Sequence, residues 1–169
     1  MIRRGVNTVQ TSSCGRLFDA VASIAGLRHE VNYEAQAAIE LEMIAAEGVD
    51  DRYPFEIEAS EPWRVDMRPA IRSITGDAQR GLDSGVIAAR FHNTMAGAIV
   101  EVCRRLRGAE KLNRVCLSGG TFQNVFLLTR TVAGLRGAGF EVFLHEKVPP
   151  NDGGISLGQA AIANRQARR

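Results

Sequence analysis

Residues 114–124 read RVCLSGGTFQN, an apolar run that two glycines interrupt before the chain turns helical. Apolar and glycine patterns predict strands over 114–117 and 140–145, each followed by a helix, over about 124–136 and 155–164. We expect the last helix to close the domain. Strand–helix–strand–helix predicts a parallel sheet, and such sheets bind ligands at the carboxyl ends of their strands.

The first two thirds of the chain are mainly helical in pattern. Apolar residues recur at helical spacing over 12–25, 33–47 and 84–108, and a short helix is expected after Pro69. Acids of the 33–47 helix are expected on its outer face; they are Glu34, Glu40 and Glu42. Residues 55–67 alternate apolar and polar side chains, which predicts a two-stranded antiparallel hairpin. The prediction is one mixed α/β domain over residues 1–169.

Composition is that of an ordinary globular protein, with 45% hydrophobic and 24% charged residues. No apolar run reaches the roughly 18–20 residues of a membrane span. The opening Met1-Ile2-Arg3-Arg4 leads into polar sequence rather than a signal core. Cys14, Cys103 and Cys116 have no metal-type spacing. We therefore expect a cytoplasmic protein without membrane contact, whose cysteines are buried, reduced thiols.

Charge is distributed unevenly along the chain. Between Glu30 and Asp66, eleven acids face only two bases, whereas the rest of the chain is strongly basic and the total is +2. The arginines of the basic part are scattered and are not interleaved with aromatic residues, as they are in nucleic-acid platforms. The pattern favours a solvated surface over a nucleic-acid partner.

The turn Ser118-Gly119-Gly120, with Asn124 after it, is the first candidate site. Two glycines let a backbone approach a phosphate closely, and the start of the next helix is expected to offer unpaired N–H groups and a positive dipole end. The pattern matches neither the Walker loop nor the Rossmann glycine motif. A tight strand-to-helix turn without a ligand explains the same residues.

A second candidate is Asp152, within the sequence PPNDGG at residues 149–154. Two prolines and two glycines make a rigid turn at the end of a strand, which suits an acid that holds a metal or a phosphate-bound cation. A helix-capping aspartate is the alternative.

A third candidate is the pair Gly15 and Asp19, which share one face of the 12–25 helix. A flat ring or sugar could lie against the glycine while the carboxylate accepts from its hydroxyls. A small contact beside a surface acid is the alternative. His29, His92 and His145 have no ligand spacing, and we assign them no role.

Four segments together resemble the C-terminal portion of HypF carbamoyltransferases, and they occur in that family's order. They are TSSCGRLFDAVA at 11–22, YEAQAAIELE at 33–42, LSGGTFQN at 117–124 and VPPNDGG at 148–154. The similarity extends from about Arg4 to Ala163, and a more distant one reaches the tRNA threonylcarbamoyladenosine-modification proteins. It implies a ribonuclease-H-like half of an actin/hexokinase/Hsp70-type (ASKHA) fold, a mixed sheet with flanking helices.

The resemblance implies a role for each candidate. Gly15 and Asp19 would contact the adenosine of ATP or carbamoyl-adenylate, with Gln36 nearby. The phosphates would meet the residues of the glycine turn, which are Ser118, Gly119, Gly120 and Asn124. Asp152 would complete a divalent metal site, iron or zinc, whose histidines come from an upstream lobe of the same enzyme.

The family's reaction passes a carbamoyl group from carbamoyl-adenylate to a cysteine of a HypE-like acceptor protein in [NiFe]-hydrogenase maturation. These 169 residues contain no H-x-x-x-H pair and no zinc-finger cysteines. We therefore expect either a fragment of a longer enzyme or a short homologue that is inactive alone and prone to self-association. A non-catalytic interaction or regulatory module, or a lobe of a tRNA-modifying relative, remains the alternative function.

Overall fold

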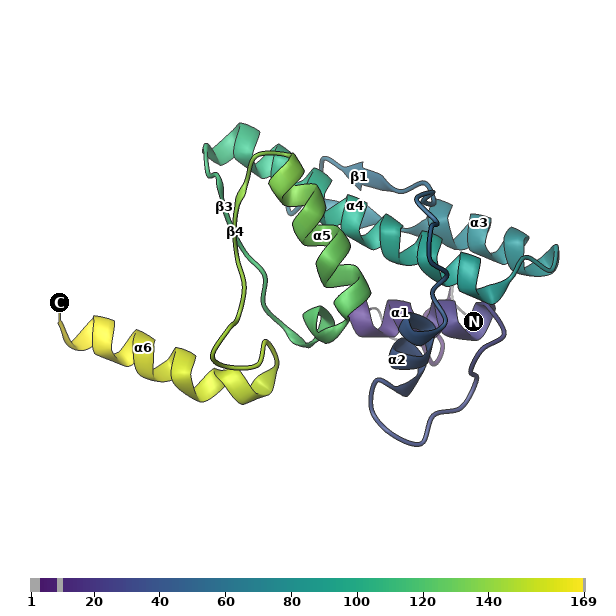
Figure 1. The fold of residues 1–169 in the computed structure, drawn as a ribbon, viewed down its shortest axis with the longest axis horizontal. Coiled ribbons are helices and arrows are strands. Elements are labelled where there is room, and N and C mark those ends of the chain that lie inside the picture. Colours follow the sequence, from purple (N-terminus) through teal and green to yellow (C-terminus); the bar gives the residue numbers. More distant parts are fainter. Residues whose placement is uncertain (1–3, 9–10, 169) are drawn as a thin grey trace.

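The computed structural model describes residues 4–8 and 11–168 (Figure 1). Two helices, a β-hairpin and two more helices come first, and a strand–helix–strand–helix segment follows. The mixed α/β class predicted from sequence is confirmed. Residues 1–3, on which part of the expectation of no signal segment rests, lie outside this description. Among the described residues, no helix is both long and apolar enough to cross a membrane.

The two N-terminal helices differ in how well they were predicted. Helix α1 spans Cys14–Ile24, within the predicted 12–25, and the Ser13 hydroxyl caps it by accepting from the Arg16 N–H at 3.3 Å. Helix α2 spans only Gln36–Met43, shorter than the predicted 33–47. Its start is late because Ala35 adopts a left-handed backbone, with φ of 62°.

The hairpin is confirmed. Strands β1 (Glu56–Glu58) and β2 (Arg64–Asp66) pair antiparallel, with Glu58 opposite Arg64. Their side chains form a 3.1 Å ion pair. Helix α3 (Arg68–Gln79) follows, and at twelve residues it is longer than the short helix expected.

Helix α4 (Ser84–Glu110) is the longest element. Asp83 caps its start, and the expected apolar stripe is buried at Ile87 and Phe91. The apolar stripe is not buried at its C-terminal end, where Leu106 is 44% exposed. The helix also continues through Gly108, where we expected it to end, and stops at a left-handed Lys111.

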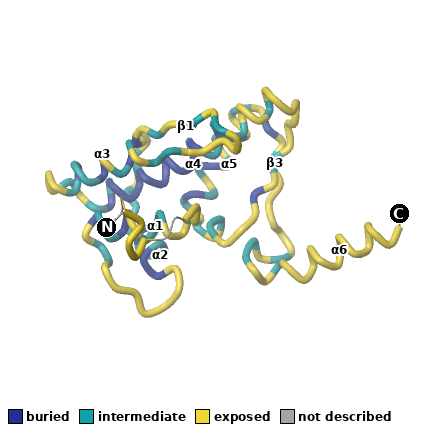
Figure 2. Tube along the Cα trace, turned by 180° about the vertical axis from the view of Figure 1, so that it is seen from behind, coloured by how far each residue is buried: buried dark blue, intermediate teal, exposed yellow. Residues whose placement is uncertain are grey.

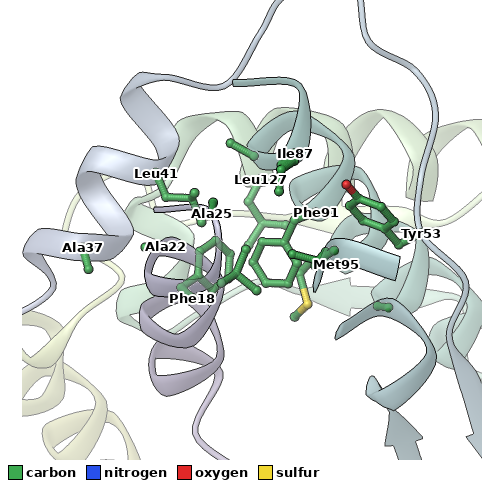
Figure 3. Packing of buried hydrophobic residues seen from close by; sticks show 14 of the residues in the cluster. Phe18, Ala22, Ala25, Ala37, Leu41, Tyr53, Ile87, Phe91, Met95 and Leu127 are labelled. Atoms are coloured by element: carbon green, nitrogen blue, oxygen red, sulfur yellow. The ribbon is translucent and has the colours of Figure 1, made fainter. Parts of the chain in front are cut away.

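The main core joins α1, α2, α3, α4 and α5 (Val125–Gly137) (Figure 3). Phe18 of α1 meets Phe91 of α4 edge to face, with ring centroids 4.8 Å apart. Leu41 of α2 and Leu127 of α5 are fully buried beside them. Each such side chain stabilises the fold by about 1.5–3 kcal/mol through burial. This core holds the first turns of α1 and α5 in fixed positions.

The C-terminal third contains β3 (Arg114–Cys116) and β4 (Glu141–Phe143), which pair in parallel as predicted. Within the described residues this sheet has two strands. Helix α6 (Ile155–Ala167) is also present, but none of its residues is buried. It extends away from the rest of the chain (Figures 1 and 2), so the expectation that it closes the domain is wrong.

Candidate functional site: two turns and a cavity

The glycine turn lies at the carboxyl end of β3. Leu117 is buried and its N–H donates to the Phe143 carbonyl at 3.0 Å, which extends the pairing with β4 by one residue. Gly119 has φ of 105°, a backbone that only glycine adopts without strain. The 3₁₀ helix η2 (Gly120–Gln123) follows, and then α5. The turn is therefore exposed at the strand end, where the sequence placed it.

The turn that contains Asp152 lies directly against the glycine turn. The Gly119 N–H donates to the Pro150 carbonyl at 2.8 Å, and a side chain at Gly120 would approach Asn151 at 4.0 Å. Asn151, rather than Asp152, caps the short helix η3 (Asp152–Gly154) by accepting from the Gly153 N–H at 3.1 Å. Asp152 is exposed beside it. The capping alternative for Asp152 is therefore wrong.

Helix α5 begins with its N–H groups already bonded. The Val125 and Phe126 N–H groups donate to Oε1 of Glu42 at 2.6 and 3.1 Å, and the Leu127 N–H donates to Oδ1 of Asn124 at 2.7 Å. We expected this end to present unpaired donors, and for these three groups that prediction is wrong. The first N–H groups of η2 have no acceptor within their own helix by geometry.

Asn124 is held from its other side by a buried histidine. His92 is fully buried on α4, and its Nδ1 lies 2.7 Å from the Ala88 carbonyl oxygen. A carbonyl only accepts, so Nδ1 carries the hydrogen and Nε2 accepts from Nδ2 of Asn124 at 2.9 Å. Burial lowers the pKa of His92, which favours this neutral state. Asn124 is thereby fixed at the entrance to α5.

Gly15 and Asp19 line a separate cavity of about 490 Å³ between α1 and the loop before α2. A side chain at Gly15 would meet only the Ser13 hydroxyl, at 3.8 Å, so the helix face is open there. Tyr33, 55% exposed, also lines the cavity and offers an aromatic ring that the sequence analysis overlooked. These residues suit a flat ring and a hydroxylated sugar.

Gln36 does not lie in this cavity's lining. It is buried; its Oε1 accepts from the Asn32 N–H and its Nε2 donates to Glu40, both at 2.8 Å. Glu40 also receives two hydrogen bonds from Arg28, which lower the pKa of its carboxyl. Gln36 therefore shapes the loop that walls the cavity.

Cys14 directly precedes Gly15 of the cavity lining. Burial raises the pKa of the Cys14 thiol, and a hydrogen bond with the Thr121 side chain partly offsets the rise. Thr121 belongs to η2. Cys14 and Cys103 are half-buried, but Cys116 is exposed, and the expectation of a buried thiol is wrong there.

His145 also lies at the glycine turn, although the sequence analysis assigned it no role. Its Nε2 is 2.9 Å from Oγ of Ser118. Ser118 is the second residue after β3 and His145 the second after β4. That shared offset from paired parallel strands was the signal in the sequence.

A larger cavity, which the sequence did not predict, lies between residues 50–57, α4 and α5 and measures about 1160 Å³. Its lining carries both charges, and Arg130 pairs there with Asp50 at 2.8 Å. Across the described residues, no three His, Cys, Asp or Glu side chains gather as a metal site. The described residues therefore do not gather a complete set of metal ligands around Asp152.

Comparison with known proteins identifies the family. Residues 1–159 match the family described as the second subdomain of the carbamoyltransferase Kae1-like domain. The chain belongs to the HypF carbamoyltransferase family. Carbamoyltransferase HypF of Synechocystis sp. is 41% identical over 161 residues, which is 94% of this chain and 20% of that protein. The HypF of Rhizobium leguminosarum bv. viciae is 36% identical over 98% of this chain and 21% of its own length.

Solved structures of HypF proteins agree. Full-length HypF in its phosphate- and nucleotide-bound form matches 97% of this chain, with a TM-score of 0.91 and 45% identity. HypF of T. kodakarensis matches 95%, with a TM-score of 0.81 and 28% identity. The chain spans about a fifth of the length of these relatives.

Proposed function

We propose that this chain is the nucleotide-binding lobe of a HypF-type carbamoyltransferase, which passes a carbamoyl group from carbamoyl-adenylate to a cysteine of a HypE-like protein in [NiFe]-hydrogenase maturation. The observation that carries the proposal is the junction of the two turns. The bond from the Gly119 N–H to the Pro150 carbonyl puts Asp152 beside the glycine turn. In group-transfer reactions, a cation held by an acid stabilises the charge on a phosphate held by a neighbouring turn.

The nucleotide would lie across the start of α1. Its adenosine would occupy the cavity of Gly15 and Asp19, and its phosphate would reach the turn of Ser118, Gly119 and Gly120. Burial raises the pKa of the Cys14 thiol, next to Gly15, and the Thr121 side chain of η2 lowers it in part, which supports this path. Full-length HypF, the relative with the TM-score of 0.91, has been solved with phosphate and nucleotide bound.

In this proposal Asn124 positions the turn and does not itself donate to the nucleotide. Its side-chain amide accepts from the Leu127 N–H and donates to Nε2 of His92, which fixes the angle at which the turn enters α5. A rigid turn keeps the donors aimed at one place, and such preorganisation is where transfer enzymes gain rate.

A divalent metal, iron or zinc, would complete the site. Asp152 fits as one oxygen ligand, since it is exposed at the turn and a hard carboxylate suits these ions. The histidines would come from the first subdomain of the Kae1-like domain, in the arrangement of an actin/hexokinase/Hsp70-type fold with a ribonuclease-H-like half on each side. The metal would neutralise charge on the leaving phosphate.

Calorimetry with ATP and ADP tests the nucleotide assignment on the 169-residue chain. We expect weak binding, because one lobe supplies only part of the contacts. Gly120→Val should weaken it at least ~10-fold, about 1.4 kcal/mol, by filling the phosphate position. Gly108→Ala is the matched control, since a side chain there meets no atom within 4 Å. Equal heats for the wild type and Gly120→Val would contradict the proposal.

A further inference from the structure

We propose that His145 is a positioning residue of the glycine turn, which orients the Ser118 hydroxyl to donate to an anionic oxygen. The inference rests on the proposed function and adds to it a residue that touches no nucleotide atom itself. It starts from the contact of Nε2 of His145 with Oγ of Ser118 at 2.9 Å.

The parallel register explains why the two side chains meet. Cys116 pairs with Phe143, so the second residue beyond each strand reaches the same sheet edge. Both Ser118 and His145 are exposed, and the pair therefore faces solvent at the turn rather than the core. Ligands of parallel sheets bind at this edge.

The direction of the hydrogen bond between His145 and Ser118 decides which group the Ser118 hydroxyl can donate to. A serine hydroxyl has one hydrogen and two lone pairs, and an imidazole nitrogen either donates or accepts. When Nε2 of His145 carries its hydrogen, it donates to the Ser118 oxygen, and the Ser118 hydrogen is left for another acceptor. A phosphate oxygen over Gly119 and Gly120 is then the partner, and bonds to charged acceptors are the strong ones.

Three backbone donors near the turn are already used, which makes the Ser118 hydroxyl more important. The Val125 and Phe126 N–H groups bond Glu42, and the Gly119 N–H bonds the Pro150 carbonyl. An anion at the turn therefore draws on the first N–H groups of η2 and on side chains. Ser118 is such a side chain, and His145 sets the direction in which it donates.

The test compares ATP with adenosine, which lacks phosphates, by calorimetry on the 169-residue chain. His145→Ala should weaken ATP binding about ten-fold and leave adenosine binding unchanged. His145→Gln retains an N–H donor and should keep most of the ATP affinity. In a Ser118→Ala background, His145→Ala should have no further effect, because it acts through that hydroxyl.

His29→Ala is the matched control. Its Nδ1 lies 2.9 Å from the Ser23 hydroxyl, so an exposed histidine pairs with a half-buried serine near the opposite end of α1 from Gly15. Losing that pair should leave the ratio of ATP to adenosine affinity unchanged. A His145→Ala variant that weakens both ligands equally, or adds fully to Ser118→Ala, would overturn the inference.

The same titrations separate this inference from the proposed function. If Gly120→Val weakens ATP binding while His145→Ala does not, the turn binds the nucleotide without help from His145. If the wild-type chain binds no ATP, or no variant at the turn alters its binding, both the proposed function and the inference are wrong.

Discussion

Oε1 of Glu42, on α2, lies 2.6 Å from the backbone nitrogen of Val125, 83 residues further along the chain. It also accepts from the Phe126 N–H at 3.1 Å. A carboxylate at a helix start satisfies orphan donors and interacts favourably with the helix dipole. Glu42 therefore fastens α2 to the helix that follows the glycine turn.

Replacing Glu42 tests this cap. Glu42→Ala should lower the free energy of unfolding by about 1 kcal/mol, because two N–H groups lose their acceptor. Glu42→Gln keeps an acceptor oxygen and should lose less. Urea denaturation of the three proteins measures the difference, and equal losses for the two variants would show that the oxygen does not act as a cap.

Glycine at residue 85 is required by packing. A side chain there would lie 2.5 Å from the Ile44 carbonyl oxygen, a backbone atom that cannot move cheaply. Gly85→Ala should therefore destabilise the chain by about 1–3 kcal/mol. Gly108→Ala, on the same helix with open space around it, should instead stabilise it by roughly 0.5–1 kcal/mol. Thermal melts that move both variants in the same direction would contradict this account of α4.

Protonation of His92 should destabilise the fold at acid pH. Burial lowers its pKa, so the unfolded chain, with an ordinary value of about 6.5, takes up this proton first as the pH falls. The free energy of unfolding should therefore decrease as the pH drops below about 6.5, and it should go on decreasing until the pH reaches the folded-state pKa. His92→Gln should lack this part of the pH dependence. Urea titrations between pH 5 and 8 measure this dependence for the wild type and the variant. The same pH dependence in both proteins would show that His92 does not contribute.

Exposed apolar side chains should make the 169-residue chain self-associate at high concentration. Met43 and Val125 are 78% and 66% exposed, and α6 exposes Ile155, Leu157 and Ile162. Single exposed apolar residues are normal, but α6 buries none of its own. Light scattering should report a rising mean mass with concentration, and Leu157→Glu should reduce the rise. A constant monomer mass over the whole range would contradict this prediction.

The sequence predicted those parts of the fold that depend on local pattern. The helix near residues 12–25, the hairpin and the parallel strands around the glycine turn all follow from spacing within one or two elements. Helix α2 was predicted too long because nothing local identifies Ala35 as left-handed. Helix α6 was placed against the domain because its small residues resemble those of a packed helix.

The site could be predicted only as separate turns. Glycines and prolines located each turn, but the hydrogen bond of Gly119 to Pro150 depends on strand pairing in space. Glu42 was expected to face outward, and its acceptor role needs a partner 83 residues away. His92 and His145 have no ligand-type spacing in the sequence, because each finds its partner on another element, and only the offset of His145 after β4 matched that of Ser118 after β3.

Carbamoyl transfer is the most direct test of the proposed function. The measurement is the mass shift of a HypE-like acceptor's cysteine in the presence of carbamoyl phosphate and ATP. We predict no shift with these 169 residues alone, and transfer once the rest of a HypF enzyme is joined to them or co-expressed. Asp152→Asn should then abolish transfer without unfolding the chain. Robust carbamoylation by the 169 residues alone, or full transfer by Asp152→Asn, would contradict the account.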